Sequence, residues 1–245
     1  MDDPKRLAFG IAGLDEMLHG GVIDGSITLL QGAPGTGKTT AGMQFLYEGA
    51  VHCDQPGLLI TFEQFPVSLY RDAAGHGWDL RRLEQQGSLR VVFTSPQVFL
   101  TSLQSPTSPI NTAIREMGIK RAVIDSVTHL RTLAREAVEL RAQYNYLING
   151  LRREGITSLL LSEEAGPDLV RSDSGRLAYV VDSVILLRFV EIDSVMQRAV
   201  AVLKARGTDH DKAIRRFEIK QEGIVVDEPF AGRQGLLSGL SRRSG

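Results

Sequence analysis

One short segment of the 245-residue chain has the residue types and the spacing of a phosphate-binding loop. It fits the pattern G-x-x-x-x-G-K-[ST], in which glycines let backbone N–H groups turn toward phosphate oxygens. Lys38 would bring positive charge to the β- and γ-phosphates, and the Thr39 hydroxyl would bind Mg²⁺. The segment therefore predicts binding of a nucleoside triphosphate with Mg²⁺, by a kinase, a GTPase or an ATPase. The candidate nucleotide-binding residues are Gly32, Ala33, Pro34, Gly35, Thr36, Gly37, Lys38, Thr39 and Thr40.

Two acidic residues can complete such a site. Asp125 ends an apolar stretch typical of a strand, where a carboxylate can hold Mg²⁺ through water. The next residue is Ser126 rather than a glutamate, so the group that activates water must come from elsewhere. Glu63 ends the strand expected after the phosphate-loop helix, and the carboxyl ends of parallel strands line the ligand site in such sheets. We interpret Glu63 as the catalytic carboxylate, and Thr39 with Asp125 as the metal-binding pair.

Two cations, Lys204 and Arg206, lie two residues apart at the end of a predicted strand. Their side chains should point to the same side, because strand side chains alternate with a period of two. They can pair with local carboxylates, Glu218 and Asp209. They can instead reach the γ-phosphate of a neighbouring subunit, as an arginine finger does in trans. The residues by themselves leave both interpretations open.

Composition restricts the class of protein. The net charge is −1, with 42% hydrophobic and 23% charged residues, which favours an ordinary globular chain over a basic nucleic-acid coat. The one cysteine, Cys53, excludes an internal disulfide framework. No stretch reaches the roughly 18 apolar residues of a membrane helix, and the N-terminus lacks the pattern of a signal peptide. We expect a cytoplasmic protein without a membrane partner. An N-K-x-D motif is absent from the sequence, which makes a GTPase less favoured than an ATPase.

The order of predicted elements indicates how these residues are positioned. Strands are expected at residues 27–31, 57–63, 89–94, 122–126 and 156–162, and helices at 38–51, 66–75, 111–117 and 133–153, with a loop at 95–109. This alternation predicts an α/β fold with a mostly parallel sheet covered on both faces. The later strands, at 180–190, 198–204, 215–221 and 223–227, lack intervening helices and predict an antiparallel extension of one sheet edge. We expect one domain over residues 1–231 and a flexible tail over 232–245.

Besides the phosphate loop, seven segments carry a recognisable pattern: residues 9–15, 20–22, 61–63, 77–80, 124–126, 203–210 and 228–230. Taken together, these segments resemble the RecA-like ATPases of the KaiC group. The resemblance implies a RecA-type core that binds ATP with Mg²⁺ between the subunits of a ring, usually a hexamer. Glu63 would match the catalytic glutamate, and Lys204 and Arg206 the cations supplied in trans. His210 would lie near the nucleotide of the neighbour. The resemblance extends nearly from end to end of the chain.

The chain departs from this pattern at two places. The family often has two adjacent acids where this chain has Glu63 and Gln64, so a single carboxylate remains for hydrolysis. The positions of the Ser-Thr phosphoacceptors of the KaiC autokinase domain carry Ala178 and Tyr179. We therefore expect ATP hydrolysis and do not carry over Ser/Thr autokinase activity.

Three functions fit this sequence. The first is a slowly hydrolysing ring ATPase that acts as a signalling module through protein partners not identified by the sequence. The second is a relative of the archaeal RadA paralogues that assists DNA recombination or repair. Its candidate DNA-binding loop, residues 163–176, is net acidic, which disfavours contact with phosphate. The third is a scaffold that binds ATP and barely hydrolyses it, and Glu63 argues against complete inactivity.

Overall fold

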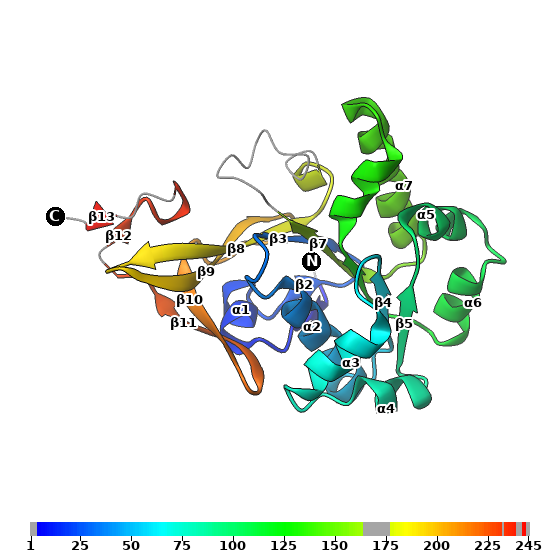
Figure 1. The fold of residues 1–245 in the computed structure, drawn as a ribbon, viewed down its shortest axis with the longest axis horizontal. Helices are drawn as coiled ribbons and strands as arrows, with labels where there is room; N and C mark the ends of the chain where they lie inside the picture. The colour runs from blue at the N-terminus through cyan, green and yellow to red at the C-terminus, as the bar shows by residue number, and fades with distance from the viewer. Residues whose placement is uncertain (1–3, 164–176, 232, 239–241, 244–245) are drawn as a thin grey trace.

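The computed structural model describes residues 4–163, 177–231, 233–238 and 242–243. In these parts, nine strands form one sheet in the order β11-β10-β9-β8-β3-β7-β6-β4-β5, with helices on both faces (Figure 1). The strands are β1 (Arg6–Leu7), β2 (Val22–Ile23), β3 (Ile27–Gly32), β4 (Gly57–Thr61), β5 (Leu89–Phe93), β6 (Arg121–Asp125), β7 (Thr157–Glu163), β8 (Ser183–Ile192), β9 (Val195–Ala205), β10 (Arg215–Lys220), β11 (Gly223–Pro229), β12 (Arg233–Gln234) and β13 (Arg242–Arg243). The helices are α1 (Ala12–Met17), α2 (Lys38–His52), α3 (Pro66–Ala74), α4 (Leu80–Gln85), α5 (Pro96–Gln104), α6 (Pro109–Glu116) and α7 (Ala137–Arg153), with 3₁₀ helices η1 (Val127–Leu133) and η2 (Leu236–Ser238).

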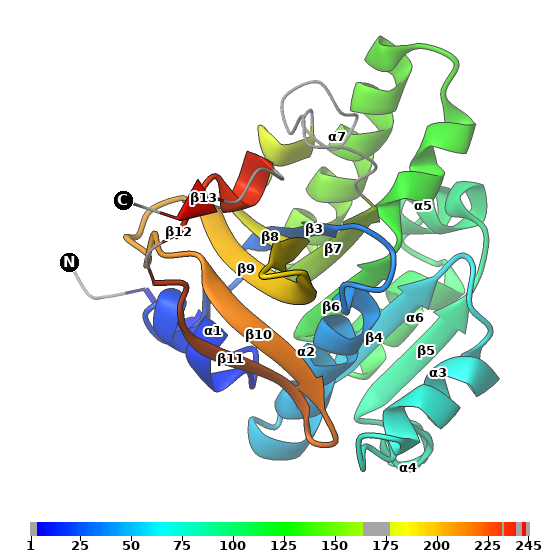
Figure 2. The same cartoon turned by 60° about the vertical axis from the view of Figure 1, so that its left-hand side comes forward.

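The sheet has a parallel part and an antiparallel part, and the predicted α/β fold class is confirmed. Strands β5, β4, β6, β7, β3 and β8 are all parallel. The antiparallel extension is correct for β9, β10 and β11 but not for β8, which pairs with β3 in parallel because it starts at the same edge as β3. Figure 2 shows β10 and β11 bending around α1 and α2.

Apolar side chains at alternate strand positions pack into two separate hydrophobic cores, one on each face of the sheet. Leu30 packs into the core under α1 to α4, whereas its neighbour Leu29 packs into the core under α5 to α7. All six residues of β3 are buried, as expected for a central parallel strand covered on both faces. The site-bearing loops at the ends of these strands are thus attached to a rigid scaffold.

The prediction of a loop at residues 95–109 is wrong, because α5 occupies most of it. Pro96 stands at the first helical position, and the Ser95 hydroxyl accepts a hydrogen bond from the Val98 N–H. Ser108 caps α6 in the same way, through the Asn111 N–H. The Pro/Ser-rich composition that suggests a loop is therefore that of two helix starts.

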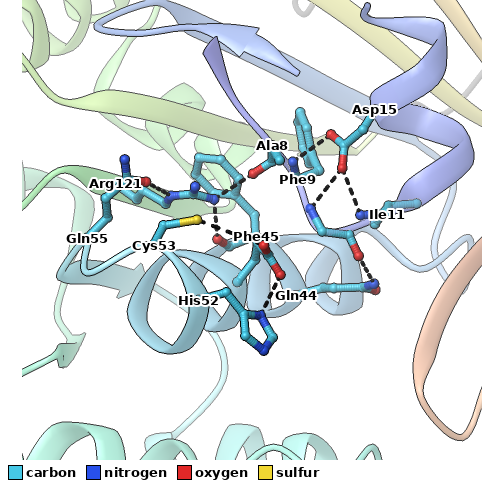
Figure 3. Close-up of polar contacts among 12 residues, drawn as sticks. Ala8, Phe9, Ile11, Asp15, Gln44, Phe45, His52, Cys53, Gln55 and Arg121 are labelled. Atoms are coloured by element: carbon cyan, nitrogen blue, oxygen red, sulfur yellow. Dashed lines mark hydrogen bonds and ion pairs between the residues drawn. The ribbon is translucent and has the colours of Figure 1, made fainter. Parts of the chain in front are cut away.

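The segment before the phosphate loop is held by the half-buried Asp15 and the buried Arg121 (Figure 3). The Asp15 carboxylate accepts hydrogen bonds from three successive backbone N–H groups, at residues 9–11. Burial raises the pKa of Asp15 to about 6, against the opposing effect of those hydrogen bonds. Arg121 is fully buried, donates to the carbonyls of Ala8 and Phe45, and lies over the Phe45 ring at 4.6 Å. These contacts fix the N-terminal segment onto α2 and β6.

The described part of the C-terminal segment packs against the sheet. Leu236 is buried with Val190, Ile192 and Ala199, and Arg188 donates to the Leu237 carbonyl. The domain boundary at residue 231 and the flexibility of residues 232–245 stay predictions. Among the described residues, none of the helices is both long and apolar enough to span a bilayer.

Candidate functional site

The phosphate loop connects the end of β3 to the start of α2, as its sequence predicts. Gly35 and Gly37 have φ values of +79° and +102°, which L side chains rarely adopt. A Cβ at Gly37 would lie 2.7 Å from Cδ1 of Ile219 on β10. The glycines therefore allow both the tight turn and the close approach of β10.

The side chains of the loop are held by the loop's own backbone. Lys38 is buried, and its Nζ donates to the carbonyls of Gly32 and Ala33 at 2.9 and 3.1 Å. The buried Thr36 hydroxyl also donates to the Ala33 carbonyl. Burial lowers the pKa of Lys38, while the carboxylates of Glu163 and Asp125 act in the opposite direction. The lysine is thus a desolvated cation beside two acids.

Asp125 and Thr39 come together, as expected for a metal-binding pair. The Thr39 hydroxyl donates to Oδ2 of Asp125 at 2.7 Å. Burial raises the pKa of Asp125, and the Thr39 hydrogen bond and the Lys38 charge lower it. The described residues contain no cluster of three or more His, Cys, Asp or Glu side chains suited to a metal ion. A hydroxyl and a carboxylate fit Mg²⁺, which prefers oxygen ligands and takes its remaining ones from phosphates and water.

Glu63 lies two residues beyond the end of β4, whose last residue Thr61 is paired with Asp125. Its side chain is 69% exposed, and its Oε2 lies 3.4 Å from Nε2 of His129 on η1. It borders a cavity of about 440 Å³ at the carboxyl edge of the sheet. The cavity is lined by Pro34, Gly35, Gly37, Lys38, Thr39, Thr40, Thr61, Glu63, Gln64, Asp125, Glu163 and Ile219.

Three of the residues at this cavity or beside it escape the sequence reasoning. Glu163 ends β7, and the strand-end argument used for Asp125 applies equally to it. His129 follows Asp125 by four residues, a spacing that carries no signal without the 3₁₀ turn between them. Ile219 comes from β10 and reaches the loop only through the bend of the antiparallel strands. Of these three residues, only Glu163 could have been predicted from the sequence, by the strand-end argument.

Lys204 and Arg206 lie at the edge formed by the amino ends of the parallel strands. The phosphate loop lies at the opposite, carboxyl edge. The start of β8 pairs with Thr28 of β3 and with the end of β9, whereas Gly32, where the loop begins, pairs with Leu187. An extra residue, Leu203, interrupts the β8–β9 register just before Lys204. The two cations of one chain therefore lie near the amino end of β3.

Backbone carbonyls, not carboxylates, hold these cations. Lys204 donates to the carbonyls of Ala178 and Val181, and Arg206 to that of Tyr179. Burial is the main cause that lowers the pKa of Lys204. Within the described ranges neither cation pairs with Glu218 or Asp209, which bind Lys220 and Lys212 instead. The local ion-pair interpretation is thus not supported.

His210 follows Arg206 on the connection from β9 to β10. The backbone N–H of the next residue, Asp211, donates to the Met17 carbonyl of α1. The Nδ1 atom of His210 is buried and has no hydrogen-bond partner among the described residues. This histidine therefore belongs to the edge that carries Lys204 and Arg206, away from the phosphate loop of its own chain.

A larger hollow, of about 830 Å³, lies between α1 and the β10–β11 pair. Its two arginines are neutralised, Arg215 by Asp211 and Glu16 and Arg216 by Asp227. It has neither a phosphate loop nor a free cation among its described lining residues. The smaller cavity is the better candidate site because the phosphate loop, Lys38 and Asp125 line it.

Known proteins are similar to this chain in sequence and in fold. The family model described as KaiC ATPase matches residues 7–230. The UPF0273 protein MJ1359 of Methanocaldococcus jannaschii is 34% identical over 91% of this chain and 96% of its own length. The circadian clock oscillator protein KaiC of Picosynechococcus is 37% identical over 88% of this chain, which spans only 43% of that protein.

A solved structure gives the same result. The crystal structure of the KaiC-like protein PH0186 from Pyrococcus horikoshii matches with a TM-score of 0.82 and 33% identity. The match covers 92% of this chain and 100% of that one. The resemblance stated from the sequence and the predicted fold class are both confirmed.

Proposed function

Because this chain belongs to the KaiC family of ATPases, we propose that it binds ATP with Mg²⁺ and hydrolyses it between the subunits of a homo-oligomeric ring. One observation carries the proposal. The phosphate loop and Glu63 lie at one edge of the sheet, and Lys204 and Arg206 lie at the other. A head-to-tail arrangement of subunits would bring the two halves together, and such contacts form a ring when the rotation between subunits closes. By the family resemblance, we expect a hexamer.

Binding requires Lys38 to exchange partners. Its Nζ would leave the carbonyls of Gly32 and Ala33 for the β- and γ-phosphate oxygens, while the N–H groups at the start of α2 face the same anion. Thr39 and Asp125 would hold Mg²⁺, Asp125 through water. The bound ion supplies charge stabilisation to the phosphates. The neighbouring acids Glu163 and Asp125 oppose the lowering of the Lys38 pKa that burial causes.

Hydrolysis requires a base near the γ-phosphate. Glu63, at the rim of the same cavity, would accept a proton from water as the water oxygen attacks phosphorus and the bond to the ADP oxygen breaks. Gln64 beside it can hydrogen-bond water but cannot take the proton. With a single carboxylate here, we propose slow turnover.

The neighbouring subunit would supply the remaining charge. Lys204 and Arg206 are pre-positioned by carbonyls of residues 178–181, and among the described residues neither cation forms an ion pair with a carboxylate. Cations that reach the γ-phosphate stabilise the charge that develops in the transition state. The unpartnered Nδ1 of His210 lies on the same edge and offers one further polar contact to the nucleotide.

At the cellular level, we propose a signalling or regulatory ATPase located in the cytoplasm that acts through protein partners. The similarity to clock proteins supports this proposal, although the chain spans less than half of those relatives. DNA recombination or repair stays the alternative function, and its candidate loop, residues 163–176, lies outside the described residues except for Glu163. Ser/Thr autophosphorylation is not proposed.

The deciding experiment measures mass by light scattering with and without Mg-ATP, and phosphate release in the same samples. A nucleotide-dependent hexamer with turnover is the expected result. A monomer that hydrolyses ATP would overturn the trans role of Lys204 and Arg206. Salt-sensitive binding of single-stranded DNA, tested in parallel, would favour the alternative function.

A further inference from the structure

We propose that His129 positions the Glu63 carboxylate for hydrolysis, in place of the second acid that many relatives have. This inference rests on the proposed function, since it assigns a role within the same site. His129 is a positioning residue here, because it acts on the attacking water only through Glu63.

The contact between these two side chains is the basis of the inference. Glu63 is largely exposed, and the described residues offer it one hydrogen-bond partner, Nε2 of His129 at 3.4 Å. An exposed glutamate samples many rotamers, and fixing it costs side-chain entropy. A partner that favours one rotamer raises the fraction of time in which the base faces the cavity.

His129 is itself held in place. Its ring packs edge-on against Phe62, with ring centroids 6.3 Å apart, and Phe62 packs against Phe99 on α5. The 3₁₀ turn that carries His129 begins at Ser126, whose hydroxyl accepts the Thr128 N–H. A histidine fixed by apolar packing can orient a mobile carboxylate.

The same turn is joined to two other strand ends of the site. The Thr128 hydroxyl accepts a hydrogen bond from the N–H of Glu163, at the end of β7. Asp125, which holds Thr39, directly precedes the turn. The turn therefore connects the metal-side acid Asp125 to the base Glu63 through His129.

The chemistry defines which atoms take part. An ionised carboxylate can only accept, so the Nε2 of His129 carries the hydrogen and donates to Oε2 of Glu63. The other oxygen, Oε1, stays free to accept the proton of the attacking water. Among the described residues, the Glu63 carboxylate has one hydrogen-bond donor, the ring of His129, which makes this ring the group that orients the base.

The test compares two substitutions at one position. His129→Gln keeps a side-chain N–H donor, whereas His129→Leu removes it with a similar apolar volume. We expect His129→Leu to lower kcat about 10-fold with an unchanged KM for ATP, as loss of base positioning should. His129→Gln should retain most of the activity. His52→Leu, at an exposed histidine on the far end of α2, is the matched control.

A double-mutant cycle separates this role from a structural one. In a Glu63→Gln background, His129→Leu should have no further effect on the residual phosphate release, because its action passes through the carboxylate. An equal loss in both backgrounds, an equal loss for Gln and Leu, or no loss for Leu would each overturn the inference. If Glu63→Gln alone keeps full turnover, the assignment of the base under the proposed function fails instead.

Discussion

The two edges of the central sheet carry opposite halves of one candidate site. At the carboxyl edge, Lys38, Asp125 and Glu63 surround a cavity that can take a triphosphate. At the amino edge, Lys204 and Arg206 are aligned by backbone carbonyls and face no phosphate loop of their own chain. Under the proposed function, one subunit would bind nucleotide by itself, whereas full catalysis would need both edges and therefore two subunits.

The largest effect is expected at the carboxyl edge, where we propose that Lys38 supplies the phosphate-binding charge. Lys38→Ala should abolish ATP binding, a loss of roughly 10³-fold or more in affinity if the charge contributes about 4 kcal/mol. It should also abolish nucleotide-dependent assembly. Titration calorimetry with Mg-ATP measures the first effect and light scattering the second. Wild-type affinity in this variant would remove the phosphate loop from the site.

Arg206→Ala tests the amino edge. We expect ATP binding to stay within about twofold of wild type and turnover to fall by roughly 10³-fold, at the low end of what arginine fingers contribute. Phosphate release at saturating ATP measures the loss. Weakened ATP binding by the isolated Arg206→Ala subunit would contradict the placement of Arg206 away from the phosphate loop of its own chain.

Glu63→Gln tests the base at the carboxyl edge. Binding should persist and turnover should fall by about 10²-fold, since general bases contribute 10²-fold or more. Mixing this variant with Arg206→Ala sharpens the comparison of the two edges. Mixed rings contain some interfaces with both residues intact, so activity should partly return. No recovery in an assembled mixture would mean that both residues act within one subunit.

Asp15 belongs to neither edge and should affect stability rather than turnover. The folded protein binds the proton of the Asp15 carboxyl more tightly than the unfolded chain does, because burial raises the pKa of Asp15 from 3.8 to about 6. The stabilisation that comes from the protonated Asp15 carboxyl is therefore fully present below pH 4 and is lost as the pH rises through 6. The difference in unfolding free energy between wild type and Asp15→Asn should shift by about 3 kcal/mol over this window, at 1.36 kcal/mol per pKa unit. Denaturant unfolding at pH 4, 5, 6 and 7 measures the shift. A pH-independent difference would show that Asp15 ionises normally.

Much of the fold is readable from local patterns, and the failures have identifiable causes. Apolar runs with intervening helical periods predict β3, β4, β5, β6 and β7 within one or two residues, because buried parallel strands have continuous apolar sequences. The helix α5 is missed because Ser and Pro mark helix starts as well as loops. The parallel pairing of β8 is missed because strand direction depends on where the connection returns to the sheet.

For the candidate site, the sequence by itself determined the residues whose chemistry is local. The glycines, Lys38 and Thr39 lie in one loop, and their spacing along the chain sets their spacing in space. Only the tertiary structure decided which distant residues join them. Glu63 contacts His129, which is 66 residues away in the sequence, and Ile219 of β10 contacts the phosphate loop. Lys204 and Arg206 lie at the amino edge, opposite that loop. The physical reason is that strand order and direction, which follow from packing of the whole chain, decide which strand ends share an edge.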